Sequence, residues 1–349
     1  MKPKKKKKRQ FRQAFARTLQ HVGKRRNPQH RFQGPLREVA ILARERYGDA
    51  IMLTPLIGCL RKRYPDVSIT VIAFSRIIFD FFSADPNVNA VYNAKKYELR
   101  YFRNLLLKRF DLLFNTKDHP STSFLMQTLL VRSRFKAGHI NTYHEGLYDH
   151  LIDMDPNTHE SLKNLAILEL IDPDGPPPEI RPYLPQMPIS DAVNKFVGSM
   201  APNRIIGINI SAGHQGGHRT PSQWTELISS FPEQTFVIFS SPGDIEEKRE
   251  IEAPNANVVP SPSTGNIGEV SEIIKKLRLL ISPDTSLVHI ASCSDTPVIA
   301  LFREKLADRC QFGPLSRRQM VIVSPTPDVA DIDNETIADA LRKMLETLP

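Results

Sequence analysis

The sequence has few cysteines and no long apolar run, and each of these features excludes a class of protein. Only three cysteines occur among the 349 residues, Cys59, Cys293 and Cys310, and they are widely spaced without a C-x-x-C pair. This pattern argues against a disulfide framework or a cysteine-based zinc site. No apolar stretch approaches the ~18–20 residues of a membrane-spanning helix, and the N-terminus lacks the apolar segment of a signal peptide. We therefore expect a soluble, cytoplasmic chain that is long enough for two domains.

Several motifs of well-known enzyme classes are also missing. The sequence contains no G-x-S-x-G elbow, no P-loop, no H-E-x-x-H pair and no G-x-G-x-x-G fingerprint. These absences set aside the α/β-hydrolases, the P-loop nucleotidases, the zinc peptidases with that motif and the dinucleotide-binding dehydrogenases.

The positive charge of the chain is concentrated at its N-terminus. The formal net charge is +9, but residues 1–30 contain 12 Lys or Arg and no acid, so the remaining residues carry 9 − 12 = −3. We expect the lysine run at 4–8 to be disordered by self-repulsion. Phe11, Phe15, Leu19 and Val22 then recur at helical spacing beside basic residues. A basic amphipathic helix is typical of a segment that lies on an anionic membrane. A solvated tail is the second interpretation, and we expect no nucleic-acid partner because no nucleic-acid-binding motif follows.

Apolar runs alternate with helical patterns through most of the remaining chain. The runs that we interpret as strands are residues 39–43, 68–74, 89–94, 111–116, 205–210, 235–240, 257–259, 279–281, 298–302 and 320–323. The helical patterns cover about 49–63, 76–83, 97–108, 122–132, 159–171, 191–200, 221–230, 243–251, 267–277, 285–293 and 333–348. Such alternation predicts an α/β fold with doubly wound parallel sheets.

A proline-rich segment divides this alternation into two halves. Residues 173–190 contain Pro173, the Pro176–Pro178 run, Pro182 and Pro185, which suit an interdomain linker. We therefore predict a tail at 1–35, an N-terminal domain at 36–172, the linker at 173–190 and a C-terminal domain at 191–349. Ligands of such sheets bind at the carboxyl ends of the strands, which we expect to face a cleft between the domains.

The turn after residue 281 has the features of an anion site. Asp284 is a favourable N-cap, and Thr285 begins a helix in which His289 follows four residues later. The first amides of a helix and its dipole attract anions, and Thr285 and Ser286 add hydroxyl donors. The turn therefore suits a diphosphate, although an ordinary capped turn would explain the same residues.

Two polar segments lie after the predicted strands 39–43 and 111–116. Gly48 permits a tight turn, and Asp49 begins the next helix, where it could act as a general base, as an N-cap, or as both. The loop Lys117-Asp118-His119-Pro120-Ser121 places two basic side chains near an acidic ligand, or else is a polar loop that caps a helix at Ser121.

A glycine-rich segment follows the strand at 205–210. Gly213, Gly216 and Gly217 would let backbone amides approach a ligand. His218 and Arg219 follow directly and could supply a donor or a cation.

Three of these segments resemble motifs of glycosyltransferase family 9, the lipopolysaccharide core heptosyltransferases. Asp284-Thr285-Ser286-Leu287-Val288-His289-Ile290-Ala291 is similar to the family's D-[ST]-G-x-x-H-[LI]-A, with Ser286 in the place of Gly. Arg44 with Gly48-Asp49 resembles its N-terminal signature, and Lys117-Asp118-His119-Pro120-Ser121-Thr122-Ser123 its K-x-x-P-S-[ST]-[ST] loop. The resemblance covers roughly residues 36–302. Where the family has Lys-x-Trp before Pro221, this chain has His218-Arg219-Thr220.

The resemblance implies the GT-B architecture of two Rossmann-like domains and an inverting, metal-independent sugar transfer without a cofactor. It implies that Asp49 is the catalytic base and that the acceptor is a lipopolysaccharide core or another anionic glycolipid, reached at the inner face of the cytoplasmic membrane. The implied donor-site residues are Gly213, His218, Arg219, Asp284, Thr285, Ser286 and His289. We expect Arg219 to replace the family's phosphate-binding Lys, one position along. The implied acceptor-site residues are Lys117, His119 and Ser121.

Two other classes remain open at this point. One is a non-catalytic nucleotide-sugar-binding protein of the same fold, and the other is a nucleotide-sugar epimerase with a similar domain pair. His159 and Lys163 also resemble a helix of the family, but a solvated helix face would explain them equally well.

Overall fold

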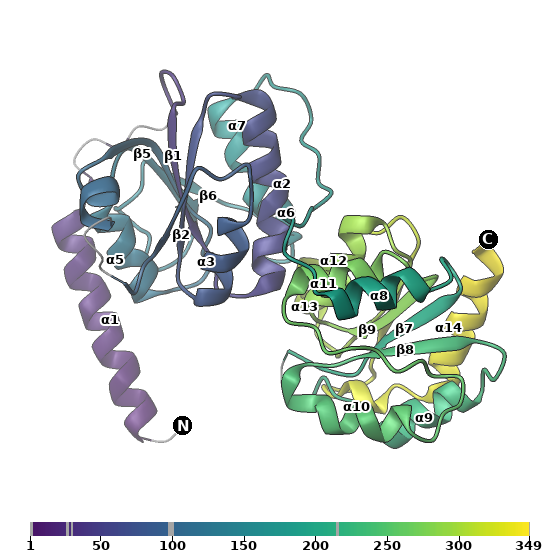
Figure 1. Cartoon of the computed structure of the whole chain (residues 1–349). Helices are drawn as coiled ribbons and strands as arrows, with labels where there is room; N and C mark the ends of the chain where they lie inside the picture. The colour runs from purple at the N-terminus through teal and green to yellow at the C-terminus, as the bar shows by residue number, and fades with distance from the viewer. Residues whose placement is uncertain (1–2, 26–27, 29–30, 97–100, 214–215, 349) are drawn as a thin grey trace. The chain divides into compact units, whose positions relative to one another are not determined.

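The computed structural model describes residues 3–348 apart from 26–27, 29–30, 97–100 and 214–215. The chain folds into two compact units (Figure 1). Unit 1 is Met1–Asp155 with Glu160–Ile180, and unit 2 is Pro156–His159 with Arg181–Pro349. Each unit holds one sheet in which all strand pairs are parallel. The predicted fold class, α/β with two doubly wound parallel sheets, is confirmed.

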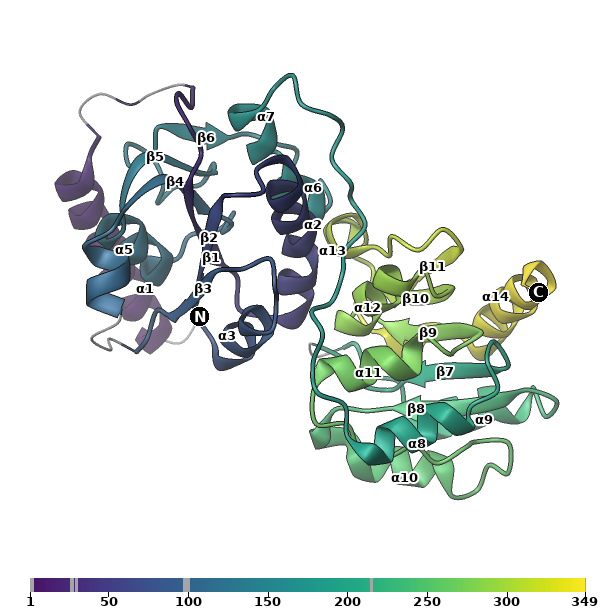
Figure 2. The same ribbon diagram turned by 45° about the horizontal axis from the view of Figure 1, so that its top comes forward.

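The sheet of unit 1 has six strands in the order β3-β2-β1-β4-β5-β6. Its strands are β1 (Glu38–Ala43), β2 (Ser68–Ala73), β3 (Ala90–Asn93), β4 (Arg109–Asn115), β5 (Arg132–His139) and β6 (His150–Ile152). Its helices are α1 (Pro3–Gly23), α2 (Tyr47–Arg63), α3 (Arg76–Ser83), the π-helix η1 (Phe102–Leu106), α5 (Thr122–Leu130), α6 (Glu160–Leu165) and α7 (Ile167–Ile171). From the central β1 the chain first adds β2 and β3 on one side, and it later adds β4, β5 and β6 on the other side. Because the connections are right-handed crossovers, α2 and α5 lie on opposite faces of the sheet (Figures 1 and 2).

The sheet of unit 2 has five strands in the order β11-β10-β9-β7-β8. Its strands are β7 (Ile205–Asn209), β8 (Thr235–Phe239), β9 (Leu279–Pro283), β10 (Val298–Phe302) and β11 (Gln319–Val323). Its helices are α8 (Asp191–Ser199), α9 (Pro221–Ser229), the 3-10 turn η2 (Pro242–Asp244), α10 (Ile245–Glu252), α11 (Ile267–Ile274), α12 (Ser286–Ser294), α13 (Leu306–Phe312), the 3-10 turn η3 (Val329–Asp331) and α14 (Asn334–Thr347). Residues 172–190, all of them described, form neither helix nor strand, and α8 belongs to unit 2.

Several predicted elements differ from the observed ones. The pattern at 159–171 forms two helices, α6 and α7, and the run at 257–259 forms only a single bridge, between Phe236 and Val258. The predicted helix at 97–108 lies partly outside the described residues, and its described part contains the π-helix η1. Sequence analysis missed β5, β6 and α13.

The basic N-terminal segment is part of unit 1. Helix α1 runs from Pro3 through the lysine run to Gly23, so the predicted disorder of residues 4–8 is wrong. Lysine has a favourable helix propensity, which offsets part of the repulsion between neighbouring charges. Ala16 is buried together with Leu125, Leu147 and Tyr148, and Leu19 packs against this cluster.

Arg25 fixes the end of this segment to the sheet. Its Nε donates a hydrogen bond of 2.9 Å to Oδ1 of Asp149, and its Nη2 donates to the carbonyl oxygen of Arg134 at 2.7 Å. The Asp149 side chain is fully buried. The apolar stripe predicted for membrane contact is therefore divided: Leu19 faces the domain, whereas Val22 is 78% exposed. None of the described helices is both long enough and apolar enough to cross a membrane.

Candidate active site

One candidate site lies at the carboxyl edge of the sheet of unit 1. Strands β1 and β4 are parallel neighbours, with Leu42 paired to Asn115. Arg44 and Glu45 follow β1, and Lys117 and Asp118 follow β4, so the two polar segments predicted from the sequence meet at one edge. The Nζ atom of Lys117 contacts a carboxylate oxygen of Glu45 at 2.6 Å.

Asp49 lies in the first turn of α2, at its third helical position, while Arg46 is the N-cap residue. Its Oδ2 accepts the backbone N–H of Arg46 at 3.3 Å, and its Oδ1 lies 3.1 Å from Nε of Arg44. The interpretation of Asp49 as the N-cap residue is therefore wrong by three positions. The carboxylate is held from two sides at the carboxyl end of β1 and keeps 11% of its side-chain surface exposed.

Arg44 is the centre of a mostly buried ionic network that sequence analysis did not predict. Besides Asp49, its guanidinium pairs with Glu160 and lies 3.7 Å from Asp118. Lys163 contacts the same two carboxylates, at 3.1 Å for Asp118 and 2.9 Å for Glu160. We call these five residues the Arg44 network. Glu160 and Lys163 are 3% and 4% exposed, so the solvated-face interpretation of Lys163 is wrong.

Burial and charge have opposite effects on the carboxyl groups of the Arg44 network. Burial alone would raise the pKa of Asp118, but the hydrogen bond with His119 and the charges of Arg44 and Lys163 outweigh it and lower that pKa below its ordinary range. For Glu160, burial dominates and raises the pKa, although Arg44 and Lys163 oppose it. The network contains three carboxylates and two cations, and the unbalanced negative charge is that of Asp49 itself, because Arg44 and Lys163 balance Asp118 and Glu160. A partly accessible carboxylate at the carboxyl end of a strand is placed where it can accept a proton from a bound hydroxyl group.

The predicted acceptor residues have different surroundings. Lys117 is 7% exposed; besides its contact with Glu45, its ammonium lies over the ring of Phe124. The ammonium group of Lys117 therefore interacts with other residues of unit 1. The side chain of His119 is 56% exposed and bonds Asp118, and Ser121 is the N-cap residue of α5. His119 and Ser121 remain candidates for acceptor contact.

A separate candidate site lies at the carboxyl edge of the sheet of unit 2. The N-cap of α12 is Thr285, whose Oγ1 accepts the backbone N–H of Leu287 at 3.3 Å. The prediction that Asp284 is the cap is wrong. Thr285 Oγ1 also accepts from Nδ2 of Asn209 at 3.0 Å and lies 3.2 Å from Oγ of Ser282. These bonds fix the turn that carries the first amides of α12, the groups that favour an anion.

His289 lies on the buried face of α12. It is 4% exposed, and burial lowers its pKa to about 3. The imidazole is therefore neutral near pH 7. A neutral imidazole would add no positive charge to the donor site, and the place of His289 in that site stays a prediction.

The glycine-rich loop after β7 approaches the same turn. A Cβ atom added to Gly213 would lie 3.8 Å from the carbonyl oxygen of Asp284, so this loop and the α12 turn are neighbours. Gly216 has a φ of +81°, a conformation that glycine adopts without strain. His218 is exposed.

Arg219 is turned into unit 2. It is 3% exposed, donates hydrogen bonds to the carbonyl oxygen of Ile332 and to Oδ1 of Asn334, and lies 5.3 Å from the ring of Trp224. This placement contradicts the prediction that Arg219 grips the donor phosphate, because its guanidinium is already directed at groups of its own unit.

One group of the described residues has the composition of a cation site. The ligand atoms of His218, Asp244 and Glu247 all lie within 4.8 Å of one another. Asp244 also accepts hydrogen bonds from Ser211 and Ser241. Carboxylate and imidazole ligands suit a divalent transition metal.

Comparison with known proteins agrees with this architecture. The model of glycosyltransferase family 9 (heptosyltransferase) matches residues 98–341. The chain belongs to this family. It is a glycosyltransferase. A second model, for a family of unknown function, matches residues 7–167.

Individual relatives are distant in sequence and similar in fold. Lipopolysaccharide heptosyltransferase 3 of Escherichia coli is 21% identical over 276 residues, covering 73% of this chain and 80% of the relative. The structure of ADP-heptose lps heptosyltransferase II of E. coli superposes with a TM-score of 0.69 at 20% identity, covering 89% of this chain and 99% of the other. That of E. coli heptosyltransferase WaaC with ADP superposes with a TM-score of 0.66 at 14% identity, covering 88% and 99%.

Proposed function

We propose that this glycosyltransferase moves a heptose from a nucleotide-sugar to a lipopolysaccharide core or a related anionic glycolipid, with inversion and without a metal. The observation that carries the proposal is Asp49, a mostly buried carboxylate held by Arg44 and the Arg46 amide at the carboxyl end of β1. Support for the sugar and the acceptor comes from the relatives, whose names specify heptose and lipopolysaccharide.

In the proposed reaction Asp49 accepts the proton of an acceptor hydroxyl. The oxygen attacks the anomeric carbon of the donor as the bond from that carbon to the diphosphate oxygen breaks, so the configuration is inverted. General-base assistance of this kind contributes ~10²–10⁴ in rate. Arg44 keeps the carboxylate oriented.

The leaving diphosphate would be stabilised at the amino end of α12. The amides of this turn, and the hydroxyl of Ser286 at the first helical position, face developing negative charge without needing to reorganise. Among the residues that replace the family's Lys-x-Trp, His218 and Thr220 are exposed; Thr220 caps α9, so His218 is our candidate for a side-chain contact with the diphosphate.

Metal independence is proposed although D-x-D triplets, which bind metal in other glycosyltransferases, occur at 153–155, 172–174 and 331–333. In two of them a carboxylate has a structural role: Asp172 pairs with Arg63 at 3.0 Å, and Asp333 caps α14. The group formed by His218, Asp244 and Glu247 is the alternative, so the activity assay below is run with and without EDTA.

We also propose that the protein works at the inner face of the cytoplasmic membrane. Eleven of the 12 basic residues of the first 30, all except Arg25, which pairs with Asp149, would attract an anionic surface by about 1 kcal/mol each, less in salt. This role can coexist with the packing of α1, because Ala16 and Leu19 use only one side of the helix.

The experiment that tests the function replaces Asp49 by Asn. The variant keeps the size of the side chain and can still accept the Arg46 amide, but it cannot take up a proton. With ADP-heptose and a lipopolysaccharide core acceptor we expect a ~10²–10⁴-fold loss of turnover, with unchanged melting and unchanged ADP binding by calorimetry. Asp66→Asn, at an exposed position between α2 and β2, is the matched control and should remain fully active.

Other outcomes of this experiment identify the alternatives. Near-normal turnover of Asp49→Asn would refute its role as the base. A wild-type protein that binds the nucleotide-sugar without transfer would be a binding protein, and release of an epimerised sugar without acceptor would indicate an epimerase.

A further inference from the structure

Three side chains of metal-binding types meet beside the sheet of unit 2. The ligand atoms of His218, Asp244 and Glu247 all lie within 4.8 Å of one another. His218 belongs to the segment that follows β7, and the two acids lie at the start of α10, which follows β8. Because β7 and β8 are parallel neighbours, their carboxyl ends bring the two segments to the same edge of the sheet.

Neither helix capping nor ion pairing explains the two acids. Asp244 is the N-cap residue of α10, but its side chain makes no capping hydrogen bond. Among the residues that the structure describes, no Lys or Arg forms an ion pair with Asp244 or Glu247, whereas the adjacent Glu246 pairs with Arg249 at 2.7 Å. Two carboxylates therefore lie close together without a protein cation. Their mutual repulsion would be relieved by a bound divalent ion.

The protein already orients the carboxylate of Asp244. Its Oδ2 accepts hydrogen bonds from the hydroxyl groups of Ser211 and Ser241. These bonds leave Oδ1 for a further partner. Hydrogen bonds of this kind fix the direction of a carboxylate that binds a metal and are a regular part of metal sites.

His218 is anchored through the backbone on both of its sides. The carbonyl oxygen of Gly216 accepts the backbone N–H of Val329 at 2.8 Å. On the other side, the buried Arg219 donates a hydrogen bond to the carbonyl oxygen of Ile332. The side chain of His218 is exposed between these two fixed points. Its imidazole can therefore complete a site with little further loss of conformational freedom.

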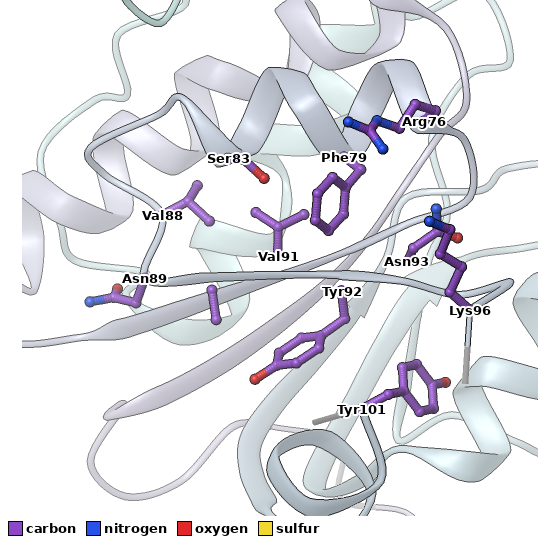
Figure 3. A pocket seen from close by; sticks show the side chains of 11 residues that line it. Arg76, Phe79, Ser83, Val88, Asn89, Val91, Tyr92, Asn93, Lys96 and Tyr101 are labelled. Atoms are coloured by element: carbon purple, nitrogen blue, oxygen red, sulfur yellow. The ribbon is translucent and has the colours of Figure 1, made fainter. Parts of the chain in front are cut away.

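The groove between α3 and β3 in unit 1 has the opposite composition. Its volume is about 370 Å³, and Figure 3 shows Arg76 and Lys96 among the side chains that line it. None of the described residues that line this groove is Asp, Glu, His or Cys. A cation in the groove would meet two positive charges and no anionic ligand, so this groove does not compete with the group in unit 2 for a metal ion.

We propose that His218, Asp244 and Glu247 bind a divalent transition-metal ion, Zn²⁺ or an ion of similar preference, which joins the segment after β7 to the start of α10. An imidazole nitrogen and carboxylate oxygens are ligands that Zn²⁺ takes, and water would complete its tetrahedral set. Ca²⁺ requires more oxygen ligands than this group offers, and Mg²⁺ gives up its waters reluctantly. Both should therefore bind more weakly than Zn²⁺.

The ion has a structural role and is not part of the proposed sugar transfer. In the strand order β9-β7-β8, the ends of β8 and β9 are two strand spacings, roughly 10 Å, apart. Asp244 follows β8, whereas the turn at Thr285 follows β9. Coordination uses one ring nitrogen of His218 and leaves the N–H of the other free to donate, so the contact proposed between His218 and the diphosphate is retained.

Two adjacent glutamates provide the test. Glu247 belongs to the group, whereas Glu246 pairs with Arg249, and both glutamates are exposed. Untagged full-length protein is treated with EDTA and dialysed, and Zn²⁺ or Mg²⁺ is then titrated by calorimetry. Glu247→Gln and His218→Gln should each weaken Zn²⁺ binding roughly tenfold or more, since losing even an outer partner of a metal site costs ~10–100-fold. Glu246→Gln removes the same charge one residue away and should leave the affinity unchanged.

Thermal melting gives a second measurement. Zn²⁺ should raise the melting temperature of the wild type and of Glu246→Gln, because an ion that binds only the folded state stabilises that state. It should raise the melting temperature of Glu247→Gln much less. Neither measurement uses a nucleotide-sugar or turnover, so the metal site can be confirmed where the proposed transfer fails, and the reverse.

Four results would overturn the proposal. They are no Zn²⁺ binding by the wild type, equal weakening in the two glutamate variants, unchanged binding in His218→Gln, and Mg²⁺ binding as tight as that of Zn²⁺. Turnover that fell with EDTA and returned with Zn²⁺ would contradict the structural role of the ion.

Discussion

Replacing Arg44 by Met tests whether the Arg44 network stabilises unit 1 and orients Asp49. Wild-type Arg44 and Lys163 face Asp49, Asp118 and Glu160, so the local charge is 2 − 3 = −1. In Arg44→Met it becomes 1 − 3 = −2, and Glu160, at 3% exposure, keeps only Lys163. Removing one partner of a buried ion pair typically costs about 3–5 kcal/mol, mostly because the remaining charge is left uncompensated.

A second substitution separates lost charge balance from lost packing. In the double variant Arg44→Met with Glu160→Gln the local charge returns to 1 − 2 = −1. If the uncompensated carboxylate causes the loss, the double variant should recover at least half of the lost free energy of unfolding. Activity should not recover, because Asp49 still lacks the guanidinium that holds its Oδ1.

The assay is urea unfolding of each variant beside acceptor turnover at saturating donor. Arg46→Met is the control, because Arg46 is exposed two residues further on; it should change stability by less than about 1 kcal/mol. A double variant no more stable than Arg44→Met would refute the electrostatic reasoning. Full turnover in Arg44→Met would refute the role of Arg44 in positioning the base.

Two further predictions concern the N-terminal segment and the buried histidines. Arg25→Ala should lower the free energy of unfolding by about 3 kcal/mol, because the fully buried Asp149 loses its ion-pair partner. The control is Lys24→Ala, at an exposed neighbouring position, which should leave the urea midpoint unchanged. Equal urea midpoints for the two variants would contradict the prediction. Burial lowers the pKa of His289 to about 3 and the pKa of His139 and His144 to about 4, so below pH ~6.5 the unfolded chain takes up protons that the folded chain does not, and stability should fall by up to ~1.4 kcal/mol per pH unit for each imidazole. Urea unfolding at pH 7.5 and 5.0 measures this loss, which His289→Gln should reduce by one imidazole's share.

The strands with continuous apolar runs were predictable, because a parallel strand that is buried on both faces consists almost entirely of apolar residues. β5 was missed because basic residues interrupt its pattern. Arg134 pairs with Asp111 at 3.1 Å, and the buried Lys136 donates from its Nζ to the carbonyl oxygen of Thr128. Partners for such residues come from distant parts of the chain, so the sequence pattern alone resembles a polar loop.

The place of Asp49 was predictable for a different reason. A residue that lies just after a buried strand and inside the first turn of a helix has its position fixed by these two elements. This position does not depend on the contacts of its side chain. The Arg44 network was not predictable in the same way, because Glu160 and Lys163 come from α6, more than 100 residues further along the chain. Only the tertiary packing of α6 against α2 brings them to Arg44.

Residues 218–220 show why the role of a cation cannot pass to the next residue of an extended segment. Residues 218–220 form neither helix nor strand, and in extended backbone successive side chains point in opposite directions. His218 is exposed and Arg219 is 3% exposed, as this alternation requires. The family's Lys corresponds to His218, so the adjacent Arg219 could not inherit its direction. Arg219 instead donates hydrogen bonds to Ile332 and to Asn334 at the start of α14.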